Sequence, residues 1–361
     1  MPDSFCFLMA GGGTGGHVIP AISVAAELRS RGHEAFFVGT ARGAEARLVP
    51  AAGFALRTIR AGGMQRVSLV AKLASAASLL YETVRQFVAF GGRRPDAVFS
   101  MGGYVAGPPV LAGLARGIPV VVMEPNATPG LTNRWIARFV AKALVNFPET
   151  AKFFPAGRTE VTGVPVREAF FHLPPRPAAA PFTVLITGGS QGSRTLNEAA
   201  RASWQALRNL GDGIYLIHQT GQAHIDALRS AFEGSGVPGE ISAFIADMPA
   251  EFARADLVIC RAGAGAVSEL AAAAKPSVLI PFPFAADDHQ LHNAACFRDV
   301  GAAILFNDAE WTGARMFETI RDLQADRNRL QSMAERAGAL AHPGAAAAAA
   351  SILEEVARKT R

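Results

Sequence analysis

The chain has 361 residues, of which 50% are hydrophobic and 18% are charged. This length and composition predict two α/β domains and exclude a disordered chain, and the longest apolar runs are too short to span a bilayer. The formal net charge of +5 indicates anionic partners, either nucleotide phosphates or an anionic membrane surface. We expect no nucleic acid, because the sequence has no Lys/Arg block interleaved with aromatics. Cys6, Cys260 and Cys296 are far apart, which favours reduced thiols in a cytoplasmic protein.

The first predicted strand, Phe5–Ala10, runs directly into a glycine-rich turn, GGGTGGH at 11–17, and then into a helix over about 21–31. Glycines let backbone N–H groups approach an anion or a sugar that any Cβ would keep away. The spacing also matches the dinucleotide fingerprint, which needs an acid after the second strand. No acid stands between that strand, 35–38, and Arg42, so an NADP oxidoreductase that uses Arg42 remains an alternative.

The same strand, turn and helix sequence opens the second half of the chain. Prolines and alanines crowd at 174–181, which predicts a linker, and the strand at 182–187 then enters the turn GGSQGS at 188–193. Strands alternate with helices throughout, which predicts parallel sheets. We therefore expect an α/β protein of two Rossmann-like, doubly wound domains facing a cleft, an N-terminal domain at 1–173 and a C-terminal domain at 182–344.

A third turn follows the predicted strand 257–260 and leads into a helix that starts near Ala264 or Gly265. The free N–H groups at such a helix start suit a diphosphate. Glu269 lies about one turn into this helix. Its carboxylate could accept hydrogen bonds from two ribose hydroxyls, or it could simply be an acid favoured by the helix dipole, and the residues alone leave both interpretations open.

Seven motifs in this order cover almost the whole chain: GGGTGGH (11–17), GGYVAGP (102–108), EPNATPG (124–130), GVPVR (163–167), GGSQGS (188–193), CRAGAGAVSE (260–269) and PFPFAADDHQLHNA (281–294). Together they closely resemble the bacterial N-acetylglucosaminyltransferases of glycosyltransferase family 28. The resemblance implies the GT-B fold and inverting transfer of N-acetylglucosamine from UDP-N-acetylglucosamine (UDP-GlcNAc) to the C4 hydroxyl of the muramyl sugar of lipid I, undecaprenyl-pyrophosphoryl-MurNAc-pentapeptide. The product is lipid II, for peptidoglycan synthesis. It further implies a peripheral enzyme at the cytoplasmic face of the inner membrane, with a C-terminal helix at about 345–361 packed on the first domain.

The resemblance also implies roles for individual residues. The residues expected to bind the donor are Thr14, Gly15, Gly16, Asn126, Arg167, Ser190, Ile245, Ala264, Gly265, Ala266, Val267, Ser268, Glu269 and Gln290. Those expected to bind the acceptor diphosphate are Gly13, Gly102, Gly103 and Tyr104. UDP-GlcNAc is a substrate, so no cofactor is implied. Met123 stands where the family often has a histidine, and no role is carried over for that histidine.

The chemistry of the transfer points to a base and to a means of stabilising UDP. A base must take the proton of the acceptor hydroxyl, and histidine suits operating pH, so His17 is our candidate; it could instead merely orient the loop. No D-x-D triplet occurs, and the pair Asp287-Asp288 is typical of a loop and helix cap. We therefore expect no metal, with backbone amides meeting the charge of UDP.

The segment 64–90 is a candidate membrane surface, because apolar residues there are interspersed with Arg66, Lys72 and Arg85. Such an amphipathic segment can also simply pack on its own core. Two other functions for the same fold stay open, a different UDP-sugar transferase such as a diacylglycerol glycosyltransferase, and a UDP-sugar epimerase.

Overall fold

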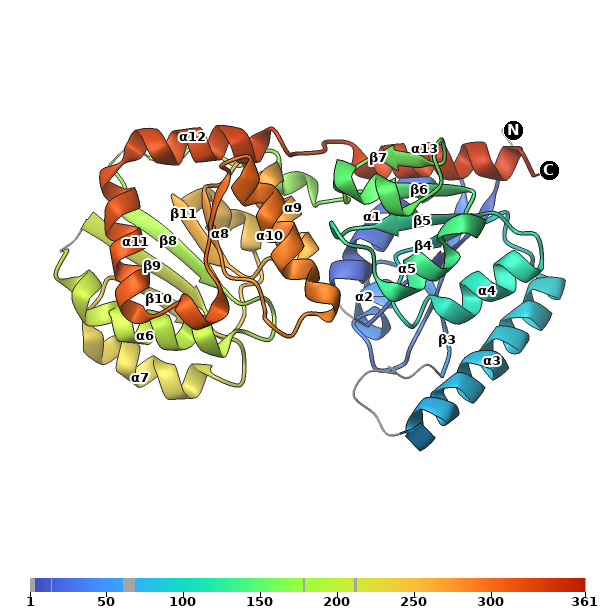
Figure 1. Cartoon of the computed structure of the whole chain (residues 1–361), viewed down its shortest axis with the longest axis horizontal. Helices are drawn as coiled ribbons and strands as arrows, with labels where there is room; N and C mark the ends of the chain where they lie inside the picture. Colours follow the sequence, from blue (N-terminus) through green and yellow to red (C-terminus); the bar gives the residue numbers. More distant parts are fainter. Residues whose placement is uncertain (1–3, 14, 61–68, 178, 211–212, 361) are drawn as a thin grey trace. The chain divides into compact units, whose positions relative to one another are not determined.

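The computed structural model describes residues 4–13, 15–60, 69–177, 179–210 and 213–360. Contacts divide the chain into two compact units, one formed by Met1–Val166 with Gly344–Arg361 and the other by Arg167–Pro343. Each unit contains one parallel sheet flanked by helices (Figure 1). The predicted class, two Rossmann-like α/β domains, is confirmed.

The sheet of the first unit has seven strands in the order β3-β2-β1-β4-β5-β6-β7. Their bounds in that order are Ala55–Thr58, Glu34–Gly39, Cys6–Ala10, Ala97–Ser100, Val120–Glu124, Lys142–Val145 and Thr159–Val161. The α-helices of this unit are α1 (Gly15–Ser30), α2 (Glu45–Ala51), α3 (Leu69–Gly92), α4 (Gly107–Ala115), α5 (Leu131–Ile136) and α13 (Ala345–Arg358). The unit also has short 3-10 helices at Ala137–Phe139 and Pro148–Phe153, and another, Glu168–Phe170, begins the second unit. Helix α1 begins six residues before the expected start, so it follows the glycine turn at once and includes His17.

Alternating side chains of the first sheet build a core on each face. In β1, Phe7 and Met9 face a core completed by α1, α2 and α13, whereas Leu8 and Ala10 face a core completed by α3, α4 and α5. All four side chains are fully buried. This is the pattern expected for a parallel sheet covered on both sides.

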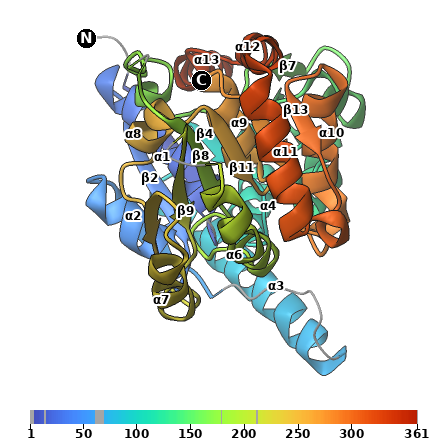
Figure 2. The same ribbon diagram turned by 90° about the vertical axis from the view of Figure 1, so that its left-hand side faces the viewer.

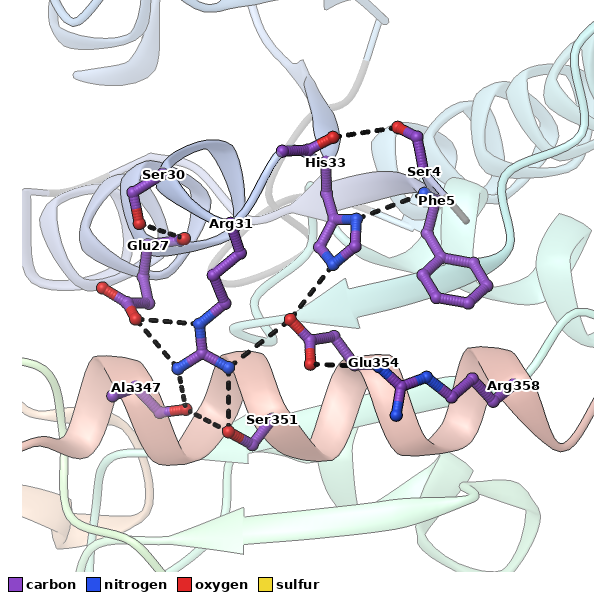
Figure 3. Close-up of polar contacts among 11 residues, drawn as sticks. Ser4, Phe5, Glu27, Ser30, Arg31, His33, Ala347, Ser351, Glu354 and Arg358 are labelled. Atoms are coloured by element: carbon purple, nitrogen blue, oxygen red, sulfur yellow. Dashed lines mark hydrogen bonds and ion pairs between the residues drawn. The ribbon is translucent and has the colours of Figure 1, made fainter. Parts of the chain in front are cut away.

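The last helix of the chain, α13, returns to the first unit and packs on α1 (Figure 1). Leu353 is fully buried there. The Arg31 guanidinium donates to Ser351 Oγ at 2.9 Å and to Ala347 O at 3.1 Å, and His33 Nε2 donates to Glu354 Oε1 at 3.0 Å (Figure 3). Apolar burial and charged hydrogen bonds therefore fix this helix to the first unit.

The sheet of the second unit has six strands in the order β10-β9-β8-β11-β12-β13. Their bounds in that order are Gly239–Ser242, Ile214–Gln219, Phe182–Thr187, Leu257–Cys260, Ser277–Leu279 and Ala303–Leu305. The helices are α6 (Arg194–Arg208), α7 (Ile225–Ser235), α8 (Met248–Arg254), α9 (Ala264–Ala272), α10 (His289–Asp299), α11 (Gly313–Ala325) and α12 (Arg327–Gly338). Side chains of α6, α7, α11 and α12 share one core with the sheet, and Figure 2 shows α6 and α11 in front of it.

The boundary between the units differs from the expected linker at 174–181. Residues from Arg167 onward belong to the second unit, because Phe170 is fully buried and its ring lies edge-on to that of Phe252, 5.1 Å away. Within the proline-rich stretch, Arg176 donates to Asp256 Oδ1 at 2.5 Å and to Arg254 O at 2.8 Å. Proline-rich composition there marks an irregular backbone, but the Arg176 side chain is held by the second unit.

Both sheets reverse their winding direction at one pair of strands, β1 and β4 in the first unit and β8 and β11 in the second. At such a point the connections leave to opposite sides and open a crevice at the carboxyl ends of the two strands. The turns at 11–13 and 102–103 follow the first pair, and those at 188–193 and 261–263 follow the second. Each unit thus places its glycine-rich turns where ligands bind in sheets of this kind.

Candidate functional site

The crevice of the first unit brings together four of the predicted residues, Gly13, His17, Gly103 and Tyr104. Gly13 and Gly103 have φ values of 89° and 76°, which only glycine adopts without strain. A Cβ on Gly13 would lie 3.9 Å from Tyr104 Oη, and a Cβ on Gly103 would lie 3.5 Å from His17 Nδ1. The half-exposed ring of Tyr104 and the imidazole therefore border the same pair of turns.

His17 lies in the first turn of α1 and contacts the glycine turn itself. Its Nδ1 is 3.4 Å from Gly12 O. A carbonyl oxygen can only accept, so in this contact Nδ1 carries the proton and Nε2 is the basic nitrogen of the ring. This tautomer is the one that a general base at Nε2 requires.

Glu45, the first residue of α2, is a site residue that the sequence analysis missed. Its carboxylate is fully buried and accepts from Thr40 N at 2.7 Å, from Thr40 Oγ1 at 2.7 Å and from Gly13 N at 2.8 Å. Burial opposes its ionisation, but the hydrogen bonds from Thr40 and Gly13 outweigh burial and lower the pKa of Glu45. The amide of Gly13, expected to meet the acceptor diphosphate, is therefore already engaged.

The motif at 124–130 is organised by a second buried carboxylate. Glu124 accepts from Asn126 N at 3.0 Å, from Gly130 N at 3.1 Å and from Asn133 Nδ2 at 2.9 Å, while burial raises its pKa. Asn133 also explains Gly102, because a Cβ there would lie 2.9 Å from Asn133 Nδ2. Glu124 thus fixes Asn126 and supports the turn that contains Gly102 and Gly103.

In the second unit, one buried amide connects two predicted donor-binding segments. Gln219, the last residue of β9, donates through Nε2 to Gly189 O at 2.8 Å and accepts at Oε1 from Ile245 N at 2.8 Å. The turn that contains Ser190 and the loop that contains Ile245 therefore keep a fixed spacing. In the sequence, the only indication of this supporting role of Gln219 is that a polar residue ends a buried strand, and it was missed.

Helix α9 presents an open N-terminus. Its N-cap is Gly263, which has no side chain to cap the helix, and nothing lies within 4 Å of where a Cβ on Gly263 or Gly265 would stand. The amides of Ala264, Gly265 and Ala266 have no acceptor within their own helix, and the helix dipole adds partial positive charge. This end of α9 suits an anion such as a diphosphate.

Glu269 and Arg167 lie close together within the second unit. Glu269 Oε1 is 4.0 Å from Arg167 Nη2, and 30% of the Glu269 side chain is exposed. Burial raises the pKa of Glu269 to about 7, and the Arg167 cation opposes this rise. The guanidinium also lies 5.0 Å from the centre of the Phe170 ring. A carboxylate and a cation thus flank the side of α9 where a nucleotide is expected.

The remaining predicted residues are distributed over both units. Gln290 follows the loop after β12, and its Oε1 accepts from Phe282 N at 3.0 Å. Gly15, Gly16 and Asn126 belong to the first unit. Thr14 lies outside the residues that the structure describes. Val267 and Ser268 are buried in α9, whereas Ala264, Gly265 and Ala266 in its first turn are partly exposed.

The acidic pair Asp287-Asp288 lies in the loop before α10, where both residues have positive φ values of 50° and 49°. Asp288 occupies the N-cap position of α10, but its side chain makes no capping hydrogen bond. Across the described ranges, no group of three or more His, Cys, Asp or Glu residues is arranged to hold a metal ion.

Helix α3 exposes an apolar face. Leu80, Tyr81, Val84 and Val88 are each more than half exposed. On the opposite side Glu82, Gln86 and Phe90 are buried, and the helix packs on α4. Arg116 lies 4.0 Å from the centre of the Phe87 ring at the border of this face. Of the segment 64–90, residues 64–68 lie outside the described part of the chain. Within that part, no helix combines the length and hydropathy needed to cross a bilayer.

Comparison with known proteins places these features in one family. The model of the glycosyltransferase family 28 N-terminal domain matches residues 7–145, and that of the family 28 C-terminal domain matches residues 183–355. The UDP-N-acetylglucosamine–N-acetylmuramyl-(pentapeptide) pyrophosphoryl-undecaprenol N-acetylglucosamine transferase of Solibacter usitatus is 59% identical over 98% of this chain and 96% of its own. The protein of the same name from Myxococcus xanthus is 39% identical over 94% and 90%. The crystal structure of Acinetobacter baumannii MurG superposes with a TM-score of 0.79 at 33% identity, covering 97% of this chain and 99% of its own.

The Glu269 carboxyl group should titrate near pH 7, and the Arg167→Gln variant should titrate at higher pH, because the carboxylate loses a nearby cation. Carbon-13 NMR of the labelled glutamate carboxyls measures both values. Arg321→Gln, an exposed arginine of α11 that pairs with Asp322, is the matched control and should leave the titration unchanged. An unchanged or lower pKa in Arg167→Gln would contradict the proposed electrostatics.

Proposed function

This chain belongs to glycosyltransferase family 28, and from that membership we propose how its two units share the reaction. Within the family it belongs with the UDP-N-acetylglucosamine–N-acetylmuramyl-(pentapeptide) pyrophosphoryl-undecaprenol N-acetylglucosamine transferases. It is a GT-B glycosyltransferase that uses UDP-GlcNAc and forms lipid II from lipid I in peptidoglycan synthesis. In our proposal the second unit binds the donor and the first unit binds the acceptor. The observation that carries this division is the uncapped N-terminus of α9, which has Glu269 and Arg167 beside it.

The donor would lie along the carboxyl edge of the second sheet. Ile245 would meet the uracil, and Glu269 would accept hydrogen bonds from the ribose hydroxyls, with Arg167 beside it. Ser190 and the first-turn amides of α9 would meet the diphosphate. Gln290 and Asn126 would contact the N-acetylglucosamine, and Thr14, Gly15 and Gly16 would contribute from the first unit.

The transfer would be a single displacement at the anomeric carbon. The C4 oxygen of the muramyl sugar forms a bond to that carbon while the bond to the UDP oxygen breaks, and UDP leaves with the electron pair. His17 Nε2 takes the proton of the attacking hydroxyl, as a proton on Nδ1, donated to Gly12 O, permits. The acceptor diphosphate would lie beside the turns that contain Gly13, Gly102 and Gly103, with Tyr104 at their edge.

Backbone amides would stabilise the leaving group without a metal. The developing negative charge on the β-phosphate would face the N–H groups of Ala264, Gly265 and Ala266, which are fixed in direction before the reaction starts. This proposal rests on the open end of α9 and needs no acidic metal site in the donor loop.

We also propose that the enzyme works as a peripheral protein at the cytoplasmic face of the cell membrane. The acceptor carries an undecaprenyl tail, so the first unit must approach a lipid surface. The exposed apolar face of α3, bordered by Arg85 and Arg116, suits insertion at an anionic interface.

The His17→Ala variant tests the assigned base. With UDP-GlcNAc and a lipid I analogue we expect kcat to fall by about 10²–10⁴-fold, because the hydroxyl proton loses its acceptor. UDP affinity, measured by calorimetry, should stay unchanged because the proposed nucleotide site lies in the second unit. Near-normal turnover with intact UDP binding would refute the assignment. Failure of the parent chain to bind UDP would overturn the proposed donor site itself.

Chelation tests the metal-free mechanism. Activity in excess EDTA should stay largely intact, because fixed amides meet the charge of UDP. The control is the same assay with added magnesium chloride. Complete loss in EDTA that magnesium restores would overturn the proposal.

Vesicle flotation tests the membrane surface. Leu80→Glu and Val88→Glu should each weaken binding to phosphatidylglycerol-containing vesicles by about tenfold or more, because each removes a side chain that would be buried in the interface. Val300→Glu, a partly exposed valine of the second unit, is the matched control. Vesicle binding that neither variant changes would exclude this face of α3.

A further inference from the structure

We propose that Glu45 is a positioning residue for the transfer, whose buried carboxylate orients His17 through the peptide unit between Gly12 and Gly13. The inference rests on the proposed function, in which His17 takes the proton of the acceptor hydroxyl. Glu45 lies in none of the motifs that point to the family, and its role follows from geometry inside the first unit.

A single peptide unit contacts both side chains. Its N–H group, at Gly13, donates to Glu45 Oε2 at 2.8 Å, and its C=O group, at Gly12, lies 3.4 Å from His17 Nδ1. The peptide bond is planar and trans, so the two groups point in opposite directions from one rigid plate. Fixing the N–H on Glu45 therefore fixes the direction of the carbonyl to which the imidazole donates.

Residues at the start of α2 make hydrogen bonds to both the N–H and the C=O group of Gly13. Gly13 O accepts from Ala44 N at 3.3 Å, next to the bond from Gly13 N to Glu45. The other carboxylate oxygen, Oε1, is held by the backbone N–H and the hydroxyl of Thr40. The carboxylate therefore cannot rotate away from Gly13 without breaking charge-assisted hydrogen bonds.

Three glycines provide the space that this carboxylate occupies. A Cβ on Gly12 would lie 2.4 Å from Oε1, one on Gly39 would lie 2.5 Å from Cγ, and one on Gly43 would lie 2.1 Å from Oε2. These glycines come from the turn after β1, the end of β2 and the loop before α2. Any larger residue at one of them would displace the carboxylate.

The arrangement has a chemical consequence beyond orientation. A carboxylate that accepts from a peptide N–H polarises that peptide and strengthens its carbonyl oxygen as an acceptor. A stronger acceptor at Gly12 O favours the proton on Nδ1 and leaves Nε2 as the base. The negative charge of Glu45 also stabilises the imidazolium that forms when Nε2 takes the hydroxyl proton.

Glu45→Gln tests the proposal with little change in volume. The backbone N–H and the hydroxyl of Thr40 both donate to Oε1, so the oxygen of the glutamine amide takes the place of Oε1. The NH₂ group of the glutamine then faces the N–H of Gly13, and two donors oppose each other. We expect kcat with the lipid I analogue to fall by about 10²-fold through misplacement of the base. The acid limb of the pH–rate profile should move to lower pH, because the imidazolium loses the stabilising charge. UDP affinity, a property of the second unit, should stay unchanged.

Two further variants separate positioning from folding. Gly43→Ala displaces the carboxylate but keeps its charge. It should reproduce the loss of kcat and move the acid limb in the same direction by a smaller amount, because the peptide unit between Gly12 and Gly13 is no longer polarised. Glu354→Gln removes another largely buried carboxylate of the first unit, one that binds His33 and Arg31, and should lower thermal stability without moving the profile (Figure 3).

The proposal fails if Glu45→Gln and Gly43→Ala keep the parental profile, or if Glu354→Gln moves it equally. If Glu45→Gln does not fold, the pH–rate profile of Gly43→Ala alone decides: a shifted acid limb supports the proposal and a parental profile refutes it. An inactive parent chain, or one that does not bind UDP, would instead be a failure of the proposed function, and it is detected before any variant is made.

Discussion

The glycine-rich turns of this enzyme have few side chains that could fix their backbone conformation. Buried polar side chains from neighbouring segments fix it instead, through hydrogen bonds. Glu45 holds the turn after β1, Glu124 with Asn133 supports the turn after β4, and Gln219 holds the turn after β8. Each of these groups is buried, where a hydrogen bond left unmade is costly. The turns therefore combine open access for a ligand with a fixed backbone.

The two units use the same strand, turn and helix arrangement in different ways. In the first unit a carboxylate from within the protein already fills the space behind the turn, and the amide of Gly13 is bound to it. In the second unit the N-cap residue of α9 is Gly263, which has no side chain to cap the helix, and it faces open space. A shared fold thus offers one surface suited to orienting a base and another suited to receiving a diphosphate, and the difference lies in a few residues outside the glycines themselves.

Local patterns were enough to predict the fold class and the place of the turns. Short buried strands ending in glycines give a parallel sheet with ligand-binding turns at its carboxyl edge, and the alternation of Phe7 and Leu8 between two cores follows from strand geometry. The supporting residues could not be predicted in this way. Glu45 reaches Gly13 across 32 positions of sequence and Gln219 reaches Gly189 across 30, and such pairs appear only when the sheet is assembled. Composition likewise could not predict that contacts divide the chain at Val166 and Arg167, because residues such as Arg176 are fixed by contacts that prolines nearby do not reveal.

The return of α13 to the first unit means that the chain passes between the units twice, near residue 166 and again near residue 343. The segment that completes the core around α1 is therefore synthesised after the whole of the second unit. On the ribosome the second unit can finish folding before the first, although it is encoded later, since all of its strands and helices precede α13. Until α13 emerges, the apolar surface of α1 that it covers stays open to water and to chaperones.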